Sequence, residues 1–304
     1  MRKFCYQRNK DAGDAYARAL IEAGFERTAD INQADFALVD RERPGTALQW
    51  LESFSRSRPV FVYPHTPLAY FLWDGHYQPV PTACNFVAGE GARASMKIYG
   101  YPYRVEACGF SRCQVRAFTP TTGSRLLFVP ARSNERGEYS SQSYAETTPR
   151  AWQFVLDHLG SFEQVTVCYV NDFVDEEDYL TTGIQFIKTD PRHGDTPTQD
   201  MLEHIERADL VISCETVGCL AVARGKPTIF YNARAVATTG HIAAANFERY
   251  RQYYQFPLTL EDMEIDEVLA VREKQNSAVE FWKEQNIGGD FDKGKFLSII
   301  REYV

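Results

Sequence analysis

The sequence predicts an α/β fold with two domains, each built around a parallel β-sheet. Short apolar runs rich in β-branched and aromatic residues alternate with helical patterns along the chain, which is typical of strand–helix–strand units. The alternation occurs twice, and the segment between the two passes, Phe118–Ser124, is rich in Thr, Pro and Gly. A chain of 304 residues is long enough for two such domains.

The composition is that of an ordinary globular protein, with 44% hydrophobic and 24% charged residues. No apolar run approaches the roughly 20 residues of a membrane-spanning helix. The N-terminus lacks the apolar core of a signal peptide. The seven cysteines include no CxxC pair, which favours reduced thiols. We therefore expect a cytoplasmic protein.

The first domain is expected over residues 1–120. Its first helix follows a polar loop and carries apolar residues at helical spacing up to Gly24, which favours a helix end. Further helices are predicted near Leu48–Phe54 and over Ala92–Tyr99. The runs that predict strands are Arg2–Tyr6, Phe36–Val39, Val60–Tyr63, Asn85–Ala88 and Val105–Cys108.

The second domain is expected over residues 124–258, and residues 259–304 are expected to form helices that pack across both domains. The predicted strands are Leu126–Pro130, Val165–Val170, Gln185–Ile187, Leu210–Ser213 and Thr228–Tyr231. The predicted helices are Trp152–Leu159, Thr198–Ala208, Cys219–Ala223, Glu261–Asn276, Val279–Asn286 and Lys293–Tyr303.

The most informative stretch is Arg207–Tyr231. Within it, Leu210–Ser213 predicts a buried strand, Cys214–Gly218 a small polar turn, and Cys219–Ala223 a compact helix that ends at Gly225. Open α/β sheets bind ligands beyond the carboxyl ends of their strands, where this turn lies. A helix N-terminus at that place suits an anionic phosphate. The alternative is an ordinary crossover between two strands.

This stretch resembles the donor-binding half of GT-B-fold glycosyltransferases and of the related non-hydrolysing UDP-sugar 2-epimerases. The matching residues are Ala208-Asp209, Ile212-Ser213, Thr216, Ala221 and Gly225-Lys226-Pro227. Many members carry a Glu seven residues before the Pro, and that Glu holds the ribose hydroxyls of the nucleotide. The position is Leu220 here, so the resemblance implies donor binding in which the ribose is held in another way.

Residues 86–109 resemble the end of a GT-B acceptor domain, with a strand, a Gly-Glu turn, a helix and a Gly-x-Pro loop before the final strand. Together the two resemblances imply two Rossmann-like domains that face a central cleft. The first would be the acceptor domain and the second the nucleotide-sugar donor domain. The C-terminal helix would cross back to the first domain.

The activity that the resemblance implies is a glycosyltransferase, which moves a sugar from a nucleotide-activated donor to a hydroxyl acceptor. Two alternatives stay open. One is an enzyme similar to the nucleotide-sugar 2-epimerases, whose motif carries a pair of Glu where this chain has Cys219-Leu220. The other is a catalytically inactive nucleotide-binding module.

Three residues are candidates for the base that deprotonates the acceptor: His65, Asp11 and Asp14. His65 follows the predicted strand Val60–Tyr63, and the ordinary pKa of histidine suits proton transfer near neutrality. Asp11 and Asp14 lie in the loop after the first strand, which touches the acceptor in the resembled enzymes. The structural alternatives are a buried core histidine and N-caps of the first helix.

Arg132 and Ser133 lie in the loop after the strand Leu126–Pro130. Arginine carries a permanent charge and a fork of donors, which suits a departing diphosphate; an exposed loop arginine is the alternative. The predicted donor-binding set is Arg132, Ser133, Ser213, Glu215, Thr216 and Gly218. The predicted acceptor-binding set is Lys10, Gly13 and Glu90.

The sequence contains no GxGxxG or Walker-type phosphate loop and no metal-ligand cluster. We therefore expect no cofactor and no metal beside the nucleotide-sugar co-substrate. Residues 1–123 carry 15 basic and 12 acidic side chains, whereas residues 124–304 carry 18 and 29. A mildly basic first domain leaves room for an anionic polymeric acceptor, such as a glycan or modified DNA. Random scatter of surface charge accounts for the difference equally well.

Overall fold

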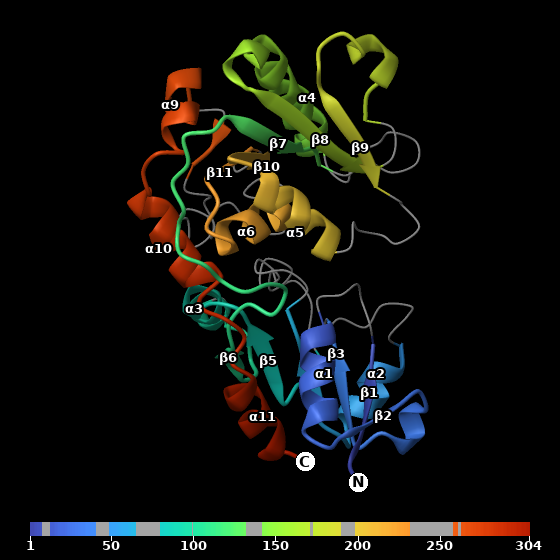
Figure 1. The fold of residues 1–304 in the computed structure, drawn as a ribbon. Coiled ribbons are helices and arrows are strands. Elements are labelled where there is room, and N and C mark those ends of the chain that lie inside the picture. Colours follow the sequence, from blue (N-terminus) through green and yellow to red (C-terminus); the bar gives the residue numbers. More distant parts are fainter. Residues whose placement is uncertain are drawn as a thin grey trace. The chain divides into compact units, whose positions relative to one another are not determined.

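A computed structural model describes residues 1–7, 13–40, 49–64, 80–98, 100–131, 142–170, 173–189, 198–231, 258–260 and 263–304. The chain forms two compact units (Figure 1). The first unit contains Met1–Gln114 and Glu284–Val304, and the second contains Val115–Lys283. Each unit is described separately below.

The first unit is built on a six-stranded sheet with the order β2-β1-β3-β4-β5-β6, in which every described pair is parallel. The strands are β1 (Lys3–Tyr6), β2 (Glu26–Thr28), β3 (Phe36–Val39), β4 (Val60–Val62), β5 (Cys84–Val87) and β6 (Val105–Ala107). The helices are α1 (Asp14–Glu22), α2 (Gln49–Ser55) and α3 (Glu90–Ile98), with α11 (Lys293–Arg301) from the end of the chain.

The central strands of this sheet are apolar throughout because both of their faces are covered. All four residues of β3 are buried. Phe36 and Leu38 pack with α1 and α11, whereas Ala37 and Val39 pack with α2 on the opposite face. The strand period of two therefore divides one short apolar run between two cores.

The C-terminal helix α11 belongs to the first unit, which confirms the predicted return of the chain. The ring of Phe296 lies 5.0 Å from that of Phe86 and 5.2 Å from that of Tyr16, measured between centroids. Asp292 caps the helix by accepting from the N–H of Lys295 at 2.8 Å. The ammonium of Lys295 in turn donates to the carbonyl oxygen of Ala107 at 2.8 Å.

The second unit is built on a five-stranded parallel sheet with the order β11-β10-β7-β8-β9. The strands are β7 (Arg125–Val129), β8 (Gln164–Val170), β9 (Gln185–Thr189), β10 (Leu210–Ser213) and β11 (Thr228–Phe230). The helices are α4 (Gln142–Asp157), α5 (Thr198–Arg207), α6 (Glu215–Ala223) and α9 (Ile265–Ala270), together with α10 (Ser277–Asn286), whose last three residues belong to the first unit. Two parallel sheets with flanking helices confirm the predicted fold class.

Four elements differ from the sequence prediction. The helix α6 begins at Glu215, four residues before the predicted Cys219. The helix predicted from Trp152 begins ten residues earlier, at Gln142, and continues through Pro149. Its buried residues Tyr144, Thr148, Ala151, Trp152 and Val155 recur at helical spacing, so packing of this stripe outweighs the cost of an internal proline.

The strand β2 was not predicted, because Glu-Arg-Thr at a sheet edge shows no apolar pattern. The helix predicted over Glu261–Asn276 is only Ile265–Ala270 among the described residues of that stretch. Its N-terminus carries a capping box in which the N-cap Glu264 pairs reciprocally with Glu267.

The segment predicted as a linker, Phe118–Ser124, is hydrogen-bonded within the second unit. Thr119 donates its N–H to the carbonyl of Gly225 at 2.9 Å, and Thr121 donates its N–H to that of Arg272 at 2.9 Å. Backbone pairing of this kind fixes a polar stretch that the sequence alone marks as a connector.

Candidate functional site

The candidate nucleotide site is the turn between β10 and α6. In the sheet, β10 lies between β7 and β11, and its last residue, Ser213, is in register with Val129 and Phe230. Three strands therefore end side by side at this turn. Cys214 is the N-cap of α6 and makes no side-chain capping hydrogen bond. Because the first N–H groups of a helix have no partner within it and carry partial positive charge, this end of α6 is suited to an anion.

Hydrogen bonds from the interior hold the turn in place. The Ser213 hydroxyl lies 3.4 Å from the carbonyl oxygen of Val129, and the Tyr231 hydroxyl lies 3.3 Å from the same oxygen. Both side chains are fully buried. Burial raises the pKa of Tyr231 well above its ordinary value, so its hydroxyl remains a donor. Ser213 supports the turn in this way, and its predicted contact with the donor stays a prediction.

The thiol of Cys214 is not a candidate nucleophile. Burial raises the pKa of Cys214 to about 11, so the thiol is neutral near pH 7 although it stands at a helix N-terminus. The site therefore offers backbone donors and a helix dipole in place of a thiolate.

Gly218 lets α6 lie directly against β11. A Cβ atom added to Gly218 would stand 2.2 Å from Cε1 of Phe230, which is far inside van der Waals contact. Cys219 and Leu220 are also buried in this unit. The position at which the resembled family carries its ribose-binding Glu is therefore a core position here. Gly218 has a packing role, and its predicted donor contact stays a prediction.

Glu215 and Thr216 are the first two residues of α6, at the end that faces the turn. Thr216 is half-buried. The sequence predicted a turn over Cys214–Gly218, but the helix begins at Glu215, so both residues lie in its first turn. Their contact with a donor stays a prediction. Arg132 and Ser133 lie outside the described residues.

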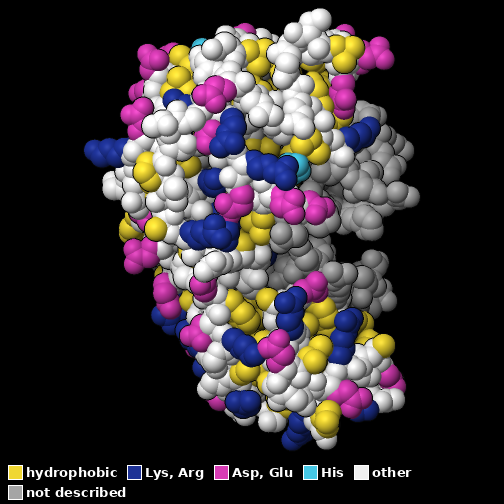
Figure 2. All heavy atoms as spheres, viewed as in Figure 1, with side chains coloured by type: hydrophobic (Ala, Val, Ile, Leu, Met, Phe, Trp, Pro, Cys, Tyr) yellow, Lys and Arg dark blue, Asp and Glu magenta, His cyan; other side chains and the backbone are white. Residues whose placement is uncertain are grey.

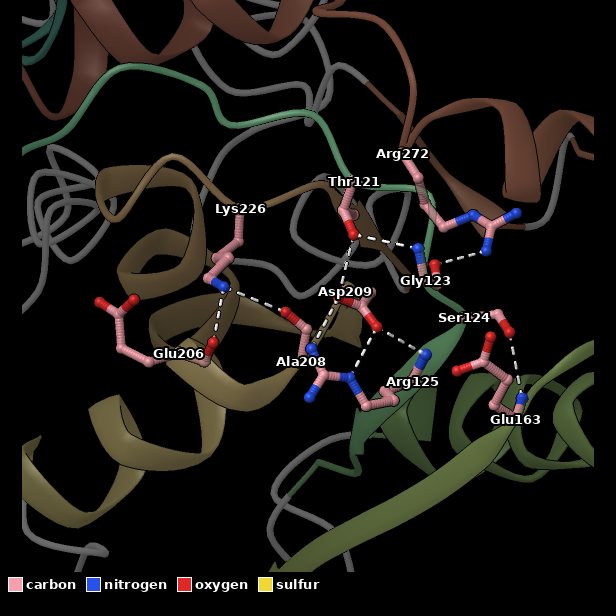
Figure 3. Close-up of polar contacts among 10 residues, drawn as sticks. All are labelled: Thr121, Gly123, Ser124, Arg125, Glu163, Glu206, Ala208, Asp209, Lys226 and Arg272. Carbon is pink, nitrogen blue, oxygen red and sulfur yellow. Dashed lines mark hydrogen bonds and ion pairs between the residues drawn. The ribbon is translucent and has the colours of Figure 1, made fainter.

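The Gly-Lys-Pro part of the motif lies at the opposite edge of the same sheet, before the start of β11. The ammonium of Lys226 donates to the carbonyl oxygens of Glu206 at 2.7 Å and Ala208 at 3.1 Å (Figure 3). These carbonyls end α5, which needs such donors because its last carbonyls have no partner in the helix. Burial lowers the pKa of Lys226. This part of the motif is thus structural.

The first unit places two tyrosines and Asp14 at the carboxyl edge of its sheet. Asp14 is the first residue of α1, and Gly13 occupies the N-cap position. The hydroxyl of Tyr6, at the end of β1, donates to Oδ1 of Asp14 at 3.1 Å. The hydroxyl of Tyr63, after β4, donates to the carbonyl oxygen of Gln7 at 3.0 Å. Because Gly13 is the N-cap, Asp14 does not have the capping role that was its structural alternative.

Glu90 is the first residue of α3, and its carboxylate lies 2.5 Å from Nε of Arg93 in an exposed ion pair along the helix. A pair of this kind contributes little stability. Its predicted contact with an acceptor stays a prediction, as does that of Gly13. His65, Asp11 and Lys10 lie outside the described residues.

Sequence reasoning did not identify Tyr6 and Tyr231 as parts of these sites. Each lies at or directly after the end of a buried strand, and each directs its hydroxyl to a group at the carboxyl edge of its sheet. A tyrosine that ends an otherwise apolar strand was the available signal, because a buried hydroxyl needs a polar partner.

Among the described residues, no group of three or more His, Cys, Asp or Glu side chains could hold a metal ion. No described helix has the length and apolar character needed to cross a bilayer. On the face shown in Figure 2, basic and acidic side chains are interspersed over the described surface.

No family model and no curated protein matches the sequence. Solved structures do share its fold. One, from Listeria monocytogenes and provisionally named a UDP-N-acetylglucosamine 2-epimerase, has a TM-score of 0.58 at 12% identity and covers 99% of this chain and 96% of its own. MurG from Acinetobacter baumannii has a TM-score of 0.51 at 10% identity and covers 99% of this chain and 100% of its own. This likeness shows that the chain has the GT-B fold with two Rossmann-like domains.

Proposed function

We propose that this protein is a glycosyltransferase that uses a nucleotide-activated sugar. The observation that carries the proposal is the turn between β10 and α6, where three strand ends and an uncapped helix N-terminus converge. A nucleoside diphosphate is the ligand whose charge suits this end of a helix. The second unit would then bind the donor and the first unit the acceptor.

The departing diphosphate carries the charge that the enzyme must stabilise. In this proposal the N-terminus of α6, with Glu215, Thr216 and the Ser213 turn, holds the donor, and Arg132 stabilises the diphosphate as it leaves. The helix dipole and a basic side chain would take the place of a metal ion. No cofactor is part of the proposed reaction.

The transfer itself needs a base on the acceptor side. The acceptor oxygen forms a bond to the anomeric carbon while the bond from that carbon to the diphosphate oxygen breaks. The base takes the hydroxyl proton, and the nucleoside diphosphate leaves. His65, Asp11 and Asp14 are the proposed candidates for this base, and Lys10, Gly13 and Glu90 would contact the acceptor.

A polymeric acceptor, either a glycan or modified DNA, is the finer part of the proposal. Its support is the mildly basic composition of residues 1–123 beside the acidic remainder of the chain. Transfer to a panel of oligosaccharides and modified DNA duplexes, compared with small alcohols, tests this part separately.

A sugar 2-epimerase is the second candidate, favoured by the likeness to the Listeria structure over nearly the whole length of both chains. Against it stand Cys219 and Leu220, which are buried where the motif of those enzymes has a pair of Glu. Incubation with a panel of nucleotide sugars separates the candidates. Release of nucleoside diphosphate that depends on an acceptor supports the transferase, and interconversion of sugars supports the epimerase. Binding without turnover would leave an inactive binding module.

The place of the nucleotide is tested by Thr216→Arg. A long side chain at the second residue of α6 should fill the turn and abolish nucleotide binding in calorimetry, while the melting temperature stays close to that of the parent. Gln153→Arg is the matched control, since Gln153 is exposed on α4 of the same unit. Unchanged affinity in the Thr216 variant would place the nucleotide elsewhere.

A further inference from the structure

We propose that Tyr6 is a positioning residue that holds the carboxylate of Asp14 toward the acceptor hydroxyl. This inference rests on the proposed function, and it selects Asp14 as the group that receives the acceptor's proton. The contact on which it is based is the hydrogen bond from the Tyr6 hydroxyl to Oδ1 of Asp14 at 3.1 Å.

The pair stands where ligands of parallel sheets bind. Tyr6 is the last residue of β1, and Asp14 is the first residue of α1, so the hydrogen bond joins a strand end to the helix that follows it. β1 lies inside the sheet, between β2 and β3. Tyr6 is buried, whereas Asp14 is half-exposed. The tyrosine therefore acts from the interior on a carboxylate that solvent and a ligand can reach.

The tyrosine hydroxyl has little freedom to move. A Cβ atom on Gly13 would lie 2.6 Å from the Tyr6 hydroxyl and 2.5 Å from Cζ of Tyr63, so the backbone at Gly13 closes tightly over both rings. The two rings lie 5.9 Å apart between centroids, and the Arg27 guanidinium stands 5.0 Å from the centroid of the Tyr6 ring. A donor fixed on several sides fixes its acceptor in turn.

The Tyr6 hydroxyl serves its hydrogen bond to Asp14, and packing of the ring does not require it. The ring of Tyr6 belongs to an apolar cluster with Phe4, Phe36 and Phe61, where phenylalanine would pack equally well. Burial and the neighbouring carboxylate and Tyr63 raise the pKa of Tyr6 far above its ordinary value. Tyr6 therefore stays protonated and donates a charge-assisted hydrogen bond to Asp14.

Within the described part of the chain, two further titratable or charged groups stand beside Tyr6. They are Tyr63 after β4 and Arg27 on β2. Of these, Tyr63 directs its hydroxyl to the carbonyl of Gln7, whereas Tyr6 donates to Asp14. Tyr63 thus holds the backbone just after β1, and Tyr6 holds the carboxylate of Asp14.

The test is a double-mutant cycle with Tyr6→Phe, Asp14→Asn and the double variant, read as kcat, the KM for the acceptor and donor affinity. We expect Asp14→Asn to lower kcat about a hundredfold or more, and Tyr6→Phe to lower it about tenfold with unchanged donor affinity. The double variant should be no slower than Asp14→Asn, because Tyr6 acts through Asp14. Both substitutions keep the shape of the side chain, so folding should survive and is checked by melting.

Tyr101→Phe is the matched control. It removes another buried hydroxyl of the first unit, which lies 3.3 Å from Oγ1 of Thr82 and 3.3 Å from Nδ2 of Asn85. It should lower stability without changing kcat. Two results would overturn this inference alone, provided that the parent enzyme transfers a sugar. One is a kcat of Tyr6→Phe within twofold of the parent value, and the other is a double variant in which the two single effects on kcat multiply. A parent enzyme that transfers no sugar from any donor would overturn the proposed function and this inference with it.

Discussion

Arg125 and Asp209 form a two-point ion pair at the amino edge of the second sheet. Nε of Arg125 lies 2.8 Å from Oδ2 of Asp209, and Nη2 lies 3.0 Å from Oδ1 (Figure 3). The same carboxylate accepts from the backbone N–H of Arg125 at 3.1 Å and from the Thr121 hydroxyl at 3.0 Å. One buried aspartate thus joins the start of β7 to β10 and to the segment that precedes β7.

The Asp209 carboxylate makes the stability of the second unit depend on pH. Hydrogen bonds from Arg125 lower the pKa of Asp209 from 3.8 to about 2. Because the folded-state pKa is the lower one, the stabilisation is fully present above about pH 4 and is lost as the pH falls toward 2. We expect Asp209→Asn to cost about 1–2 kcal/mol at pH 7, a range that allows for the half-exposed Arg125.

Chemical denaturation of both proteins between pH 2 and 7 measures this effect. The difference between parent and Asp209→Asn should shrink toward acid pH. Asp178→Asn, at an exposed position of the same unit, serves as the control and should follow the parent throughout. A constant difference across the pH range would contradict the assignment to this carboxylate.

The close contact between Gly218 and Phe230 predicts that even an alanine at position 218 lowers the free energy of unfolding. Gly218→Ala places a Cβ atom 2.2 Å from Cε1 of Phe230, so α6 must move away from β11. We expect a loss of about 1–3 kcal/mol in unfolding free energy and weaker nucleotide binding. Gly160→Ala is the control, because a Cβ atom there meets nothing within 4 Å. Equal stability of the two variants would show that α6 does not require this close approach.

Lys226 should contribute to the stability of the fold and not to nucleotide binding. Lys226→Met leaves the carbonyl oxygens of Glu206 and Ala208 without their donor, which should cost about 1–3 kcal/mol. Nucleotide affinity should stay within twofold of the parent, since the ammonium caps α5 at the edge of the sheet opposite the turn. Lys274→Met, at an exposed position, is the control for loss of charge. A specific loss of affinity would return the Gly-Lys-Pro motif to the binding site.

Arg132 is predicted to stabilise the departing diphosphate more than it holds the donor. Removing one charged donor to a transition-state anion should cost about 2–4 kcal/mol, or two to three orders of magnitude in rate. Arg132→Ala should therefore lower kcat by this factor, while calorimetry of nucleotide binding changes much less. Turnover within threefold of the parent would remove Arg132 from the mechanism.

The sequence by itself determined the class of fold and most of its elements. Apolar runs such as Phe36–Val39 and Leu210–Ser213 predict buried parallel strands because a strand covered on both faces must be apolar at every position. The end of β10 at Ser213 follows from that pattern too, whereas the predicted turn Cys214–Gly218 is mostly the start of α6. Local signals of this kind did not predict elements that are stabilised by contacts with the rest of the fold. The strand β2 carries no apolar residue, and the helix α4 continues through Pro149.

Only the tertiary structure decided what the motif residues do. Lys226 and Thr216 lie ten positions apart in one motif, yet Lys226 caps α5 and Thr216 lies in the first turn of α6 at the other edge of the sheet. Tyr6 became the partner of Asp14 because β1 and α1 bring them together. A hydrogen bond depends on distance and direction in space, and a sequence pattern records only the order and polarity of the groups that make it.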